Sequence, residues 1–166
     1  MATVEEPRAA AETFIRPDGK EKVTGIGRYT ADLTLTGQVY AKLKYADQTH
    51  ARVTRIDVSK ARALPGVCAV LTYEDVPEVK YGGMVQDRYL FVKDKVIWEG
   101  DVVAGVAALT EEIAEQAVGL IEVDYEPLPV VADFAAALEA GAPLVHDDWE
   151  SDSGDDTMGR DRNRIG

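Results

Sequence analysis

The sequence predicts an α+β fold with a mixed sheet and a few short helices. Three observations predict it: several segments of strand length alternate apolar and polar residues, one five-residue segment is continuously apolar, and one longer segment has the apolar spacing of a helix. The order of these elements along the chain is that of an α+β domain.

The first three strands are expected at residues 39–45, 52–58 and 67–71. The first two alternate apolar and polar side chains, as half-buried strands do. The third is a continuous apolar run, which predicts a central strand. Cys68 lies within this run, so we expect it to be an inert core thiol.

Two further strands are expected at 95–98 and 102–109, on the two sides of the turn Glu99-Gly100-Asp101. The two strands and the turn together predict a hairpin. The last strand is expected over 121–125, where Ile121, Val123 and Tyr125 alternate with acidic residues. Pro127 follows and ends it.

Three short helices are each preceded by a residue whose side-chain oxygen can cap a helix N-terminus. These pairs are Ser59 before 60–64, Thr110 before a helix that begins at Glu111, and Asp133 before 134–140. The first regular element is expected near Val23. These elements predict an extended N-terminal arm at 1–22, one domain at 23–146, and an acidic linker or tail at 147–166.

The chain is acidic, with 30 Asp and Glu against 18 Lys and Arg, a formal charge of -12. This charge argues against nucleic acid and anionic membrane surfaces as partners, because both carry negative charge themselves. We find no secretory leader and no apolar segment long enough to span a bilayer, and the one cysteine cannot form an internal disulfide. A cytoplasmic protein is therefore expected.

Isolated motifs do not predict an active site. Gly25-Ile26-Gly27 lacks the third glycine and the strand and helix of a dinucleotide fingerprint, so a turn is expected there. His50 and His146 have no nucleophile nearby in sequence, which favours structural or surface roles. The acidic cluster at 148–156 departs from the EF-hand pattern and predicts a solvated tail. We expect no catalytic residue, cofactor-binding residue or metal ligand in this chain.

The whole pattern nevertheless resembles a known family. Residues from about 20 to 146 resemble the N-terminal α/β-hammerhead domain of the molybdopterin-binding large subunit of the xanthine dehydrogenase and aldehyde oxidase family, the molybdenum hydroxylases. The matching stretches are Val23-Thr24-Gly25, Gly27-Arg28-Tyr29 with Asp32, Thr49-His50-Ala51-Arg52-Val53, Ile56-Asp57, Ala63-Leu64-Pro65-Gly66-Val67, Leu71-Thr72 with Glu74-Asp75-Val76-Pro77, Phe91 with Lys93-Asp94-Lys95-Val96, Gly100-Asp101-Val102-Val103-Ala104, Ala114 with Ala117, and Val123-Asp124-Tyr125-Glu126-Pro127-Leu128-Pro129. The residues before His50 depart from the family pattern, and Gly105 stands where alanine or valine is usual.

The resemblance implies a non-catalytic domain or subunit that shapes the substrate funnel of an enzyme hydroxylating a heteroaromatic compound or an aldehyde. It implies a molybdopterin-type molybdenum cofactor, [2Fe–2S] clusters and FAD in the partner chains: a molybdopterin-binding catalytic chain, an iron–sulfur subunit and an FAD subunit. The family's large subunit continues far beyond the length of this chain, so the resemblance implies either a split or cleaved subunit or a cut-out domain.

Two alternatives stay open on the residues alone. A free-standing binding or assembly protein can reuse the same fold, since fold does not fix function. Asp94-Lys95 resembles the lysine-bearing turn of lipoyl carrier domains, although Lys95 here starts an expected strand.

The loop between the matched stretches contains Gly82, Gly83, Met84 and Val85. By the resemblance, Met84 and Val85 correspond to two apolar residues that line the substrate channel. Apolar side chains desolvate a flat aromatic substrate, and glycines let the backbone turn close to it. The alternative is that both side chains only cover the sheet as loop anchors.

We predict that the chain, purified alone, binds no stoichiometric molybdenum or iron and has no turnover. The reason is that a [2Fe–2S] cluster takes four cysteine ligands and this chain has one cysteine, Cys68. Elemental analysis of the purified chain tests this, and one equivalent of either metal would contradict it.

Overall fold

The computed structural model describes residues 16–83, 86–146, 160–161 and 164–165. The chain divides into two compact units, residues 1–38 and 39–166, and each is described by itself. The first unit holds helix α1 (Gly19–Val23) and the 3-10 turn η1 (Thr30–Asp32). The first element therefore begins before Val23, contrary to the sequence prediction, because Asp18 forms an i,i+4 ion pair with Lys22 across the first turn. The domain boundaries at 22/23 and 146/147 stay predictions.

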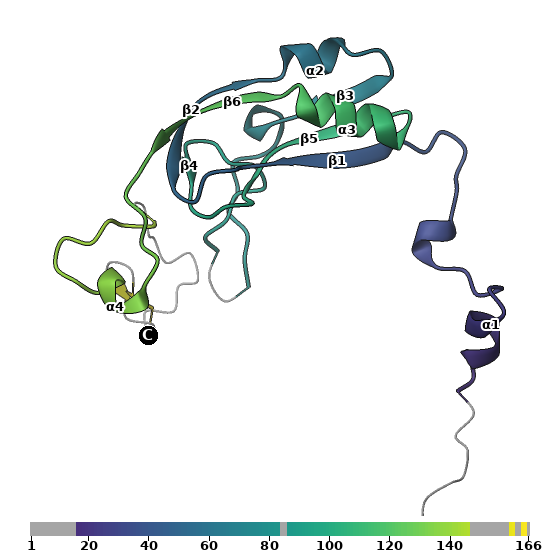
Figure 1. Ribbon diagram of the computed structural model, residues 1–166, viewed down its shortest axis with the longest axis horizontal. Coiled ribbons are helices and arrows are strands. Elements are labelled where there is room, and N and C mark those ends of the chain that lie inside the picture. The colour runs from purple at the N-terminus through teal and green to yellow at the C-terminus, as the bar shows by residue number, and fades with distance from the viewer. Residues whose placement is uncertain (1–15, 84–85, 147–159, 162–163, 166) are drawn as a thin grey trace, which may run out of the picture. The chain divides into compact units, whose positions relative to one another are not determined.

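The second unit is built on two three-stranded antiparallel sheets, which confirms the α+β class (Figure 1). The first sheet has the order β1 (Tyr40–Tyr45), β5 (Val102–Ala108), β3 (Val67–Leu71). The second has the order β4 (Lys95–Val96), β2 (Ala51–Asp57), β6 (Glu122–Pro127). A separate pair joins β7 (Arg160–Asp161) to β8 (Arg164–Ile165).

Strand pairing corrects two sequence predictions. The expected hairpin of 95–98 with 102–109 does not form, because β4 pairs with β2 and β5 pairs with β1 and β3. The turn at 99–101 therefore connects the two sheets. The expected central strand, β3, is an edge strand, and β5 is central. Four of the seven residues of β5 are buried, as is expected of a strand with a neighbouring strand on each side.

Cys68 was expected in the core, and the structure shows it exposed. The pairing of β3 with β5 shifts register between Val67 and Ala69, so Cys68 lies at an irregularity in the strand. A residue at such a shift does not follow the regular alternation of side chains between the two faces of the sheet. The apolar run therefore includes an exposed residue, Cys68.

The helices confirm two of the three predicted caps. Thr110 Oγ1 accepts from the Ile113 N–H at 3.3 Å at the start of α3 (Glu111–Gly119), and Asp133 Oδ1 accepts from the Ala135 N–H at 2.8 Å at the start of α4 (Phe134–Ala137). Ser59 is not a cap, because helix α2 (Ser59–Ala63) already includes it. Its N–H instead donates to Asp57 Oδ1 at 2.9 Å.

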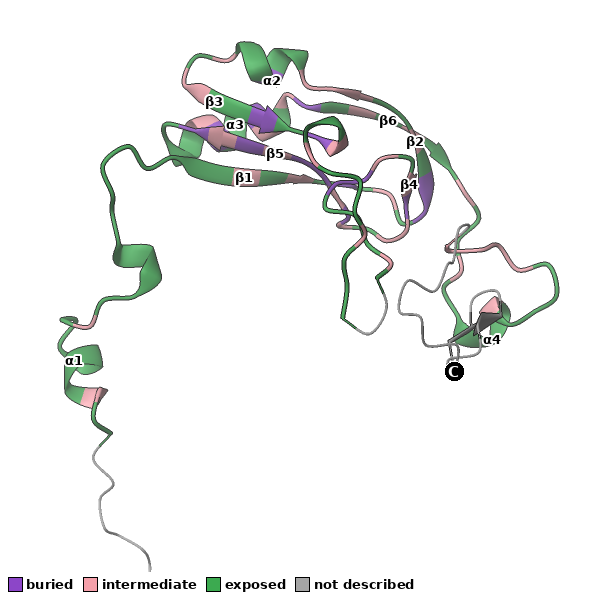
Figure 2. Ribbon diagram, turned by 180° about the vertical axis from the view of Figure 1, so that it is seen from behind, coloured by how far each residue is buried: buried purple, intermediate pink, exposed green. Residues whose placement is uncertain are grey.

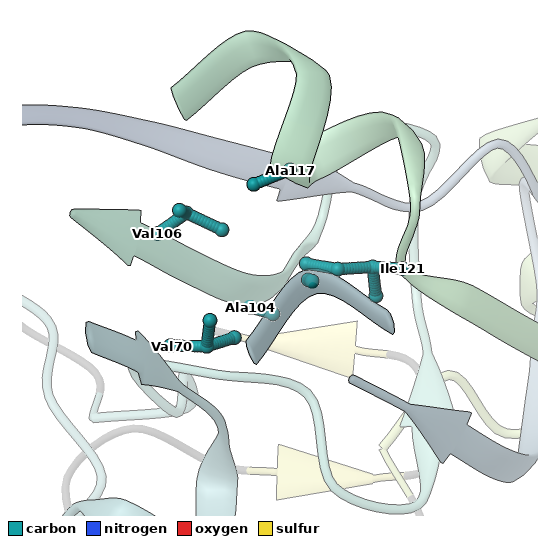
Figure 3. Close-up of a cluster of buried hydrophobic side chains, with 6 residues drawn as sticks. Val70, Ala104, Val106, Ala117 and Ile121 are labelled. Carbon is teal, nitrogen blue, oxygen red and sulfur yellow. The ribbon is translucent and has the colours of Figure 1, made fainter. Parts of the chain in front are cut away.

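The larger core cluster lies where α3 packs on the first sheet. Ala117 of α3 points toward Val106 of β5, with Val70, Ala104 and Ile121 around them (Figure 3). A second cluster joins Val96 and Val103 with Ala46 and Val92, and Ile56 and Val123 pack on both clusters. No helix in the described ranges has the length and apolar character needed to cross a membrane.

We predict that alanine at Gly66 destabilises the fold. Gly66 has φ +92°, and an added Cβ would lie 2.7 Å from Ile113 Cδ1. The Ile113 side chain can turn away, so the left-handed backbone sets a loss of about 1–2 kcal/mol in the free energy of unfolding. Urea denaturation of Gly66→Ala measures it.

Two matched variants test whether the left-handed backbone is the cause of the loss. Gly100 has φ +99° with open space at the Cβ position, so Gly100→Ala should lose about 1 kcal/mol through backbone strain alone. Gly119, in α3, has neither a positive φ nor a neighbour, so Gly119→Ala should gain about 0.5–1 kcal/mol. Equal stability of all three variants would refute this account.

Candidate functional site

A pocket of about 540 Å³ lies in the second unit, and segments distant in sequence line it. They are the residues that flank the loop at 82–87, the turn between β4 and β5, and the pair Val145 and His146. Aromatic and charged side chains both line it. Since the sequence predicted the loop as the functional segment, this pocket is the candidate site.

The base of the loop is closed by a backbone bridge. The Tyr81 N–H donates to the Arg88 carbonyl at 2.8 Å, and the Arg88 N–H donates to the Tyr81 carbonyl at 3.2 Å. The loop between them is thus tied at its base. The predicted channel residues, Met84 and Val85, lie outside the described residues.

Arg88 also contacts the opposite wall of the pocket. Its guanidinium carbon lies 4.4 Å from the centroid of the Trp98 ring. A guanidinium over an indole face is attracted by the ring quadrupole, by about 0.5–2 kcal/mol according to exposure. The loop base is therefore held to the turn that follows β4.

Asp101 organises that turn. It is buried, and its carboxylate accepts from the backbone N–H groups of Ile97, at 2.9 Å, and Trp98. The Ala46 N–H donates to the Asp101 carbonyl at 2.8 Å, so the turn is also fixed to the end of β1. Burial raises the pKa of Asp101 above its ordinary value, while the two N–H donors and the charge of Arg88 act in the opposite direction.

The segment before residue 147 closes a further side of the pocket. Lys95 Nζ donates to the Leu144 carbonyl at 3.2 Å, and His146 Nε2 lies 3.6 Å from Asp87 Oδ2. Lys95 begins β4 with its ammonium group in this contact. It does not present the free hairpin tip that a lipoyl attachment lysine needs.

His50 lies in the interior and outside the pocket lining. Its Nδ1 is 2.6 Å from the Pro129 carbonyl oxygen, which can only accept, so Nδ1 carries the proton. Nε2 is buried, and no described group is within hydrogen-bonding distance of it. This ring joins the start of β2 to the chain beyond β6, a structural role of the kind that the sequence predicted.

Several charged side chains of the pocket lie in contact with one another or with rings: Lys93 with Glu78, His146 with Asp87, and Arg88 with Trp98. Among the described residues no three His, Cys, Asp or Glu side chains are grouped to hold a metal. Sequence reasoning missed Arg88, Trp98 and Asp101. One signal was available: Trp98, one of two tryptophans, directly precedes a turn with Gly100.

Comparison with known proteins was made on both sequence and structure. The family model described as "Aldehyde oxidase and xanthine dehydrogenase, a/b hammerhead domain" matches residues 24–129. The chain is 40% identical over 135 residues to a probable xanthine dehydrogenase subunit of Bacillus subtilis, a match of 81% of this chain and 18% of the relative. It is 36% identical over 135 residues to the nicotinate dehydrogenase large molybdopterin subunit of Eubacterium barkeri, covering 81% of this chain and 32% of the relative.

A solved structure of a Cu,Mo-CO dehydrogenase superimposes with a TM-score of 0.79 and 34% identity, over 89% of this chain and 19% of the other. This chain therefore spans less than a third of the length of each of these relatives.

We predict a pH-dependent stability difference between wild type and Asp101→Asn. Because folding raises this carboxyl's pKa above the ordinary 3.8, the folded protein binds the proton more tightly than the unfolded chain. The wild type should therefore lose stability relative to Asp101→Asn as the pH rises from below about 3.8 through the raised pKa, and the difference should be constant above it. Urea denaturation of both proteins across this range measures it.

Asp101→Ala is the matched control, since it removes the acceptor as well as the charge. It should lose about 1–3 kcal/mol relative to Asp101→Asn at every pH, because buried N–H groups are left unpaired. A wild type that gains stability relative to Asp101→Asn with rising pH would contradict the assigned cause.

Proposed function

The chain belongs to the aldehyde oxidase and xanthine dehydrogenase family as its α/β-hammerhead domain, and from this we propose that it is a non-catalytic domain or subunit of a molybdenum-containing hydroxylase. Its part is to shape the substrate funnel and to pack against the molybdopterin-binding catalytic chain. An iron–sulfur subunit and an FAD subunit complete the proposed complex. The substrate class is a heteroaromatic compound or an aldehyde.

One observation carries the proposal of a funnel wall. Residues on both sides of the segment that contains Met84 and Val85 line the pocket, and the base of this segment is fixed by the Tyr81 to Arg88 bridge and by Arg88 on Trp98. A wall that selects substrates must hold its geometry, because apolar contacts act only near van der Waals range. The buried Asp101 fixes the turn that presents Trp98 and so supports the same wall.

The residues of this chain do not fit the ligand sets of the family's metals. The sequence holds one cysteine, and the described residues hold no group of three potential ligands. We therefore assign the molybdenum cofactor, the [2Fe–2S] clusters and FAD to the partner chains. When bound there, the molybdenum centre supplies the oxidative hydroxylation, and this chain's residues orient the substrate and exclude water.

The test is purification of the native enzyme through a tag on this chain. We expect molybdenum, molybdopterin and iron in constant ratio to the chain, and oxidation of a heteroaromatic compound or an aldehyde with a dye as electron acceptor. A stable, metal-free species of 18.0 kDa would instead support the alternative, a free-standing binding or assembly protein that reuses the hammerhead fold.

For the channel residues, we predict that Met84→Trp or Val85→Trp changes substrate preference in the assembled enzyme. A bulkier side chain in the funnel should change the ratio of kcat/KM between a small and a large substrate by about tenfold, while the molybdenum content stays normal. Steady-state kinetics with two substrates of different size measures it.

Gln116→Trp, on the exposed part of α3, adds the same bulk elsewhere and should leave that ratio unchanged. Unchanged preference in both loop variants would favour the simpler role of Met84 and Val85 as loop anchors.

A further inference from the structure

The first sheet is covered by helices on one face. Successive strand residues point to opposite faces, and Val70, Ala104 and Val106 lie on the face that packs on α3. The opposite face carries small and apolar residues from all three strands. We call these six residues the bare sheet face: Ala41 and Leu43 of β1, Gly105 and Ala107 of β5, and Ala69 and Leu71 of β3.

Two leucines of this face are left open to solvent. Leu43 and Leu71 pair with Gly105 from its two sides, so the three residues form one row across the sheet. Leu43 is 41% and Leu71 is 44% exposed. Seen from behind, β1 and much of β3 carry the exposed colour (Figure 2). None of the six residues is charged, although the chain carries a net charge of -12.

The centre of the row is a glycine, and Phe91 packs over it. A Cβ added at Gly105 would meet Phe91 Cζ at 3.4 Å and Leu43 Cδ2 at 3.5 Å, and Phe91 itself is buried. A glycine inside a central strand often marks a place where another segment approaches closely. Here that segment is the one that carries Phe91, so the exposed part of the bare sheet face is Leu43 and Leu71 on the two sides of Gly105.

A groove of about 280 Å³ lies near the bare sheet face. Its lining includes Tyr73, two residues after Leu71, and Phe91, which packs on Gly105. Val76, Pro77 and Leu90 also line it, and Leu90 is 53% exposed. Lys93 and Glu78, which form an ion pair at 2.9 Å, and Glu74 also line it. Because the sheet face and the groove share Phe91, we treat them as one surface, with charged residues in the groove part.

We propose that this surface docks the molybdenum-binding part of the large subunit, through an uncharged, apolar segment of that part; the inference rests on the function proposed above. The solved relative leaves about four fifths of its own chain outside the match, so a large body of protein is available to cover the surface. The absence of charge on the bare sheet face requires a contact driven by apolar burial.

A second copy of this chain fits the surface less well. From strand spacing and rise, the bare sheet face and groove together measure roughly 200–400 Å². A stable dimer buries about 800 Å² on each partner, whereas contacts between domains of one assembly are often smaller. Two copies would also bring together two net charges of -12. Size and charge both favour the large-subunit partner.

The unpaired edge of β1 is a poorer docking site than the face. Lys42 and Lys44 alternate along this strand, and Lys42 Nζ contacts Glu111 Oε1 of α3 at 2.6 Å. Lysines on an edge strand discourage pairing with a further strand. The contact is therefore expected on the sheet face, between side chains.

Thiol labelling tests the proposal. In a Cys68→Ser background, Leu71→Cys should react with a maleimide at least tenfold more slowly in the purified molybdenum enzyme than in the isolated chain. Gln116→Cys, on the exposed part of α3, should react at similar rates in both. Equal reactivity of Leu71→Cys in both states, or equal protection of Gln116→Cys, would overturn the proposal.

Charge variants give an independent measurement. Leu43→Asp and Leu71→Asp should lower the yield of molybdenum-containing complex at least tenfold, with little change in the far-ultraviolet spectrum of the isolated chain. Phe134→Asp, the same change at an 86% exposed side chain of α4, should assemble as the wild type does. Normal assembly of both leucine variants would overturn the proposal, and so would an equal loss with Phe134→Asp.

The outcomes also separate this inference from the function on which it rests. Failure of the wild-type chain to purify with molybdenum would overturn both. Normal molybdenum content together with an accessible Leu71→Cys would overturn the docking surface alone. Protection of Leu71→Cys in the isolated chain, with a dimer mass in sedimentation, would assign the surface to a second copy and overturn the large-subunit partner.

Discussion

Strand β5 is the element on which the second unit depends. It makes backbone hydrogen bonds along both edges, to β1 and β3, and it contributes buried residues to both core clusters. Val103, Ala104 and Ala108 are fully buried and Val106 is nearly so. The small residues let α3 approach closely through Ala114 and Ala117, which are also fully buried. A single strand therefore sets the position of the covering helix and of both edge strands.

The candidate site follows from the residues that lead into this strand. The turn before β5 must reach from the second sheet to the first, and Asp101 stabilises it by accepting two backbone N–H groups in the interior. This turn presents Trp98, which holds Arg88 and with it the base of the loop. The same physical feature, a buried carboxylate at a sheet-to-sheet connection, thus supports both the fold and the pocket wall.

The other face of the same sheet is not covered by α3. Protein domains bury the apolar side of a sheet against another layer, and here α3 covers one side. On the other side Phe91 packs on Gly105, while Leu43 and Leu71 of the bare sheet face stay exposed. A domain that forms less than a third of each compared relative is expected to share its layers with the rest of such a protein.

The sequence by itself determined the fold class, the family, the positions of β1, β2 and β3, and the start of α3. The alternation along a strand and the cap formed by Thr110 depend on residues that are close together in the chain, so the sequence pattern alone predicts them. Only the tertiary structure decided which strands pair. β4 joins β2 and not β5, β3 lies at an edge, and Cys68 is exposed, because pairing depends on residues far apart in sequence. The wall of Arg88, Trp98 and Asp101 is likewise nonlocal: these residues lie close together only because the turn before β5 links two sheets.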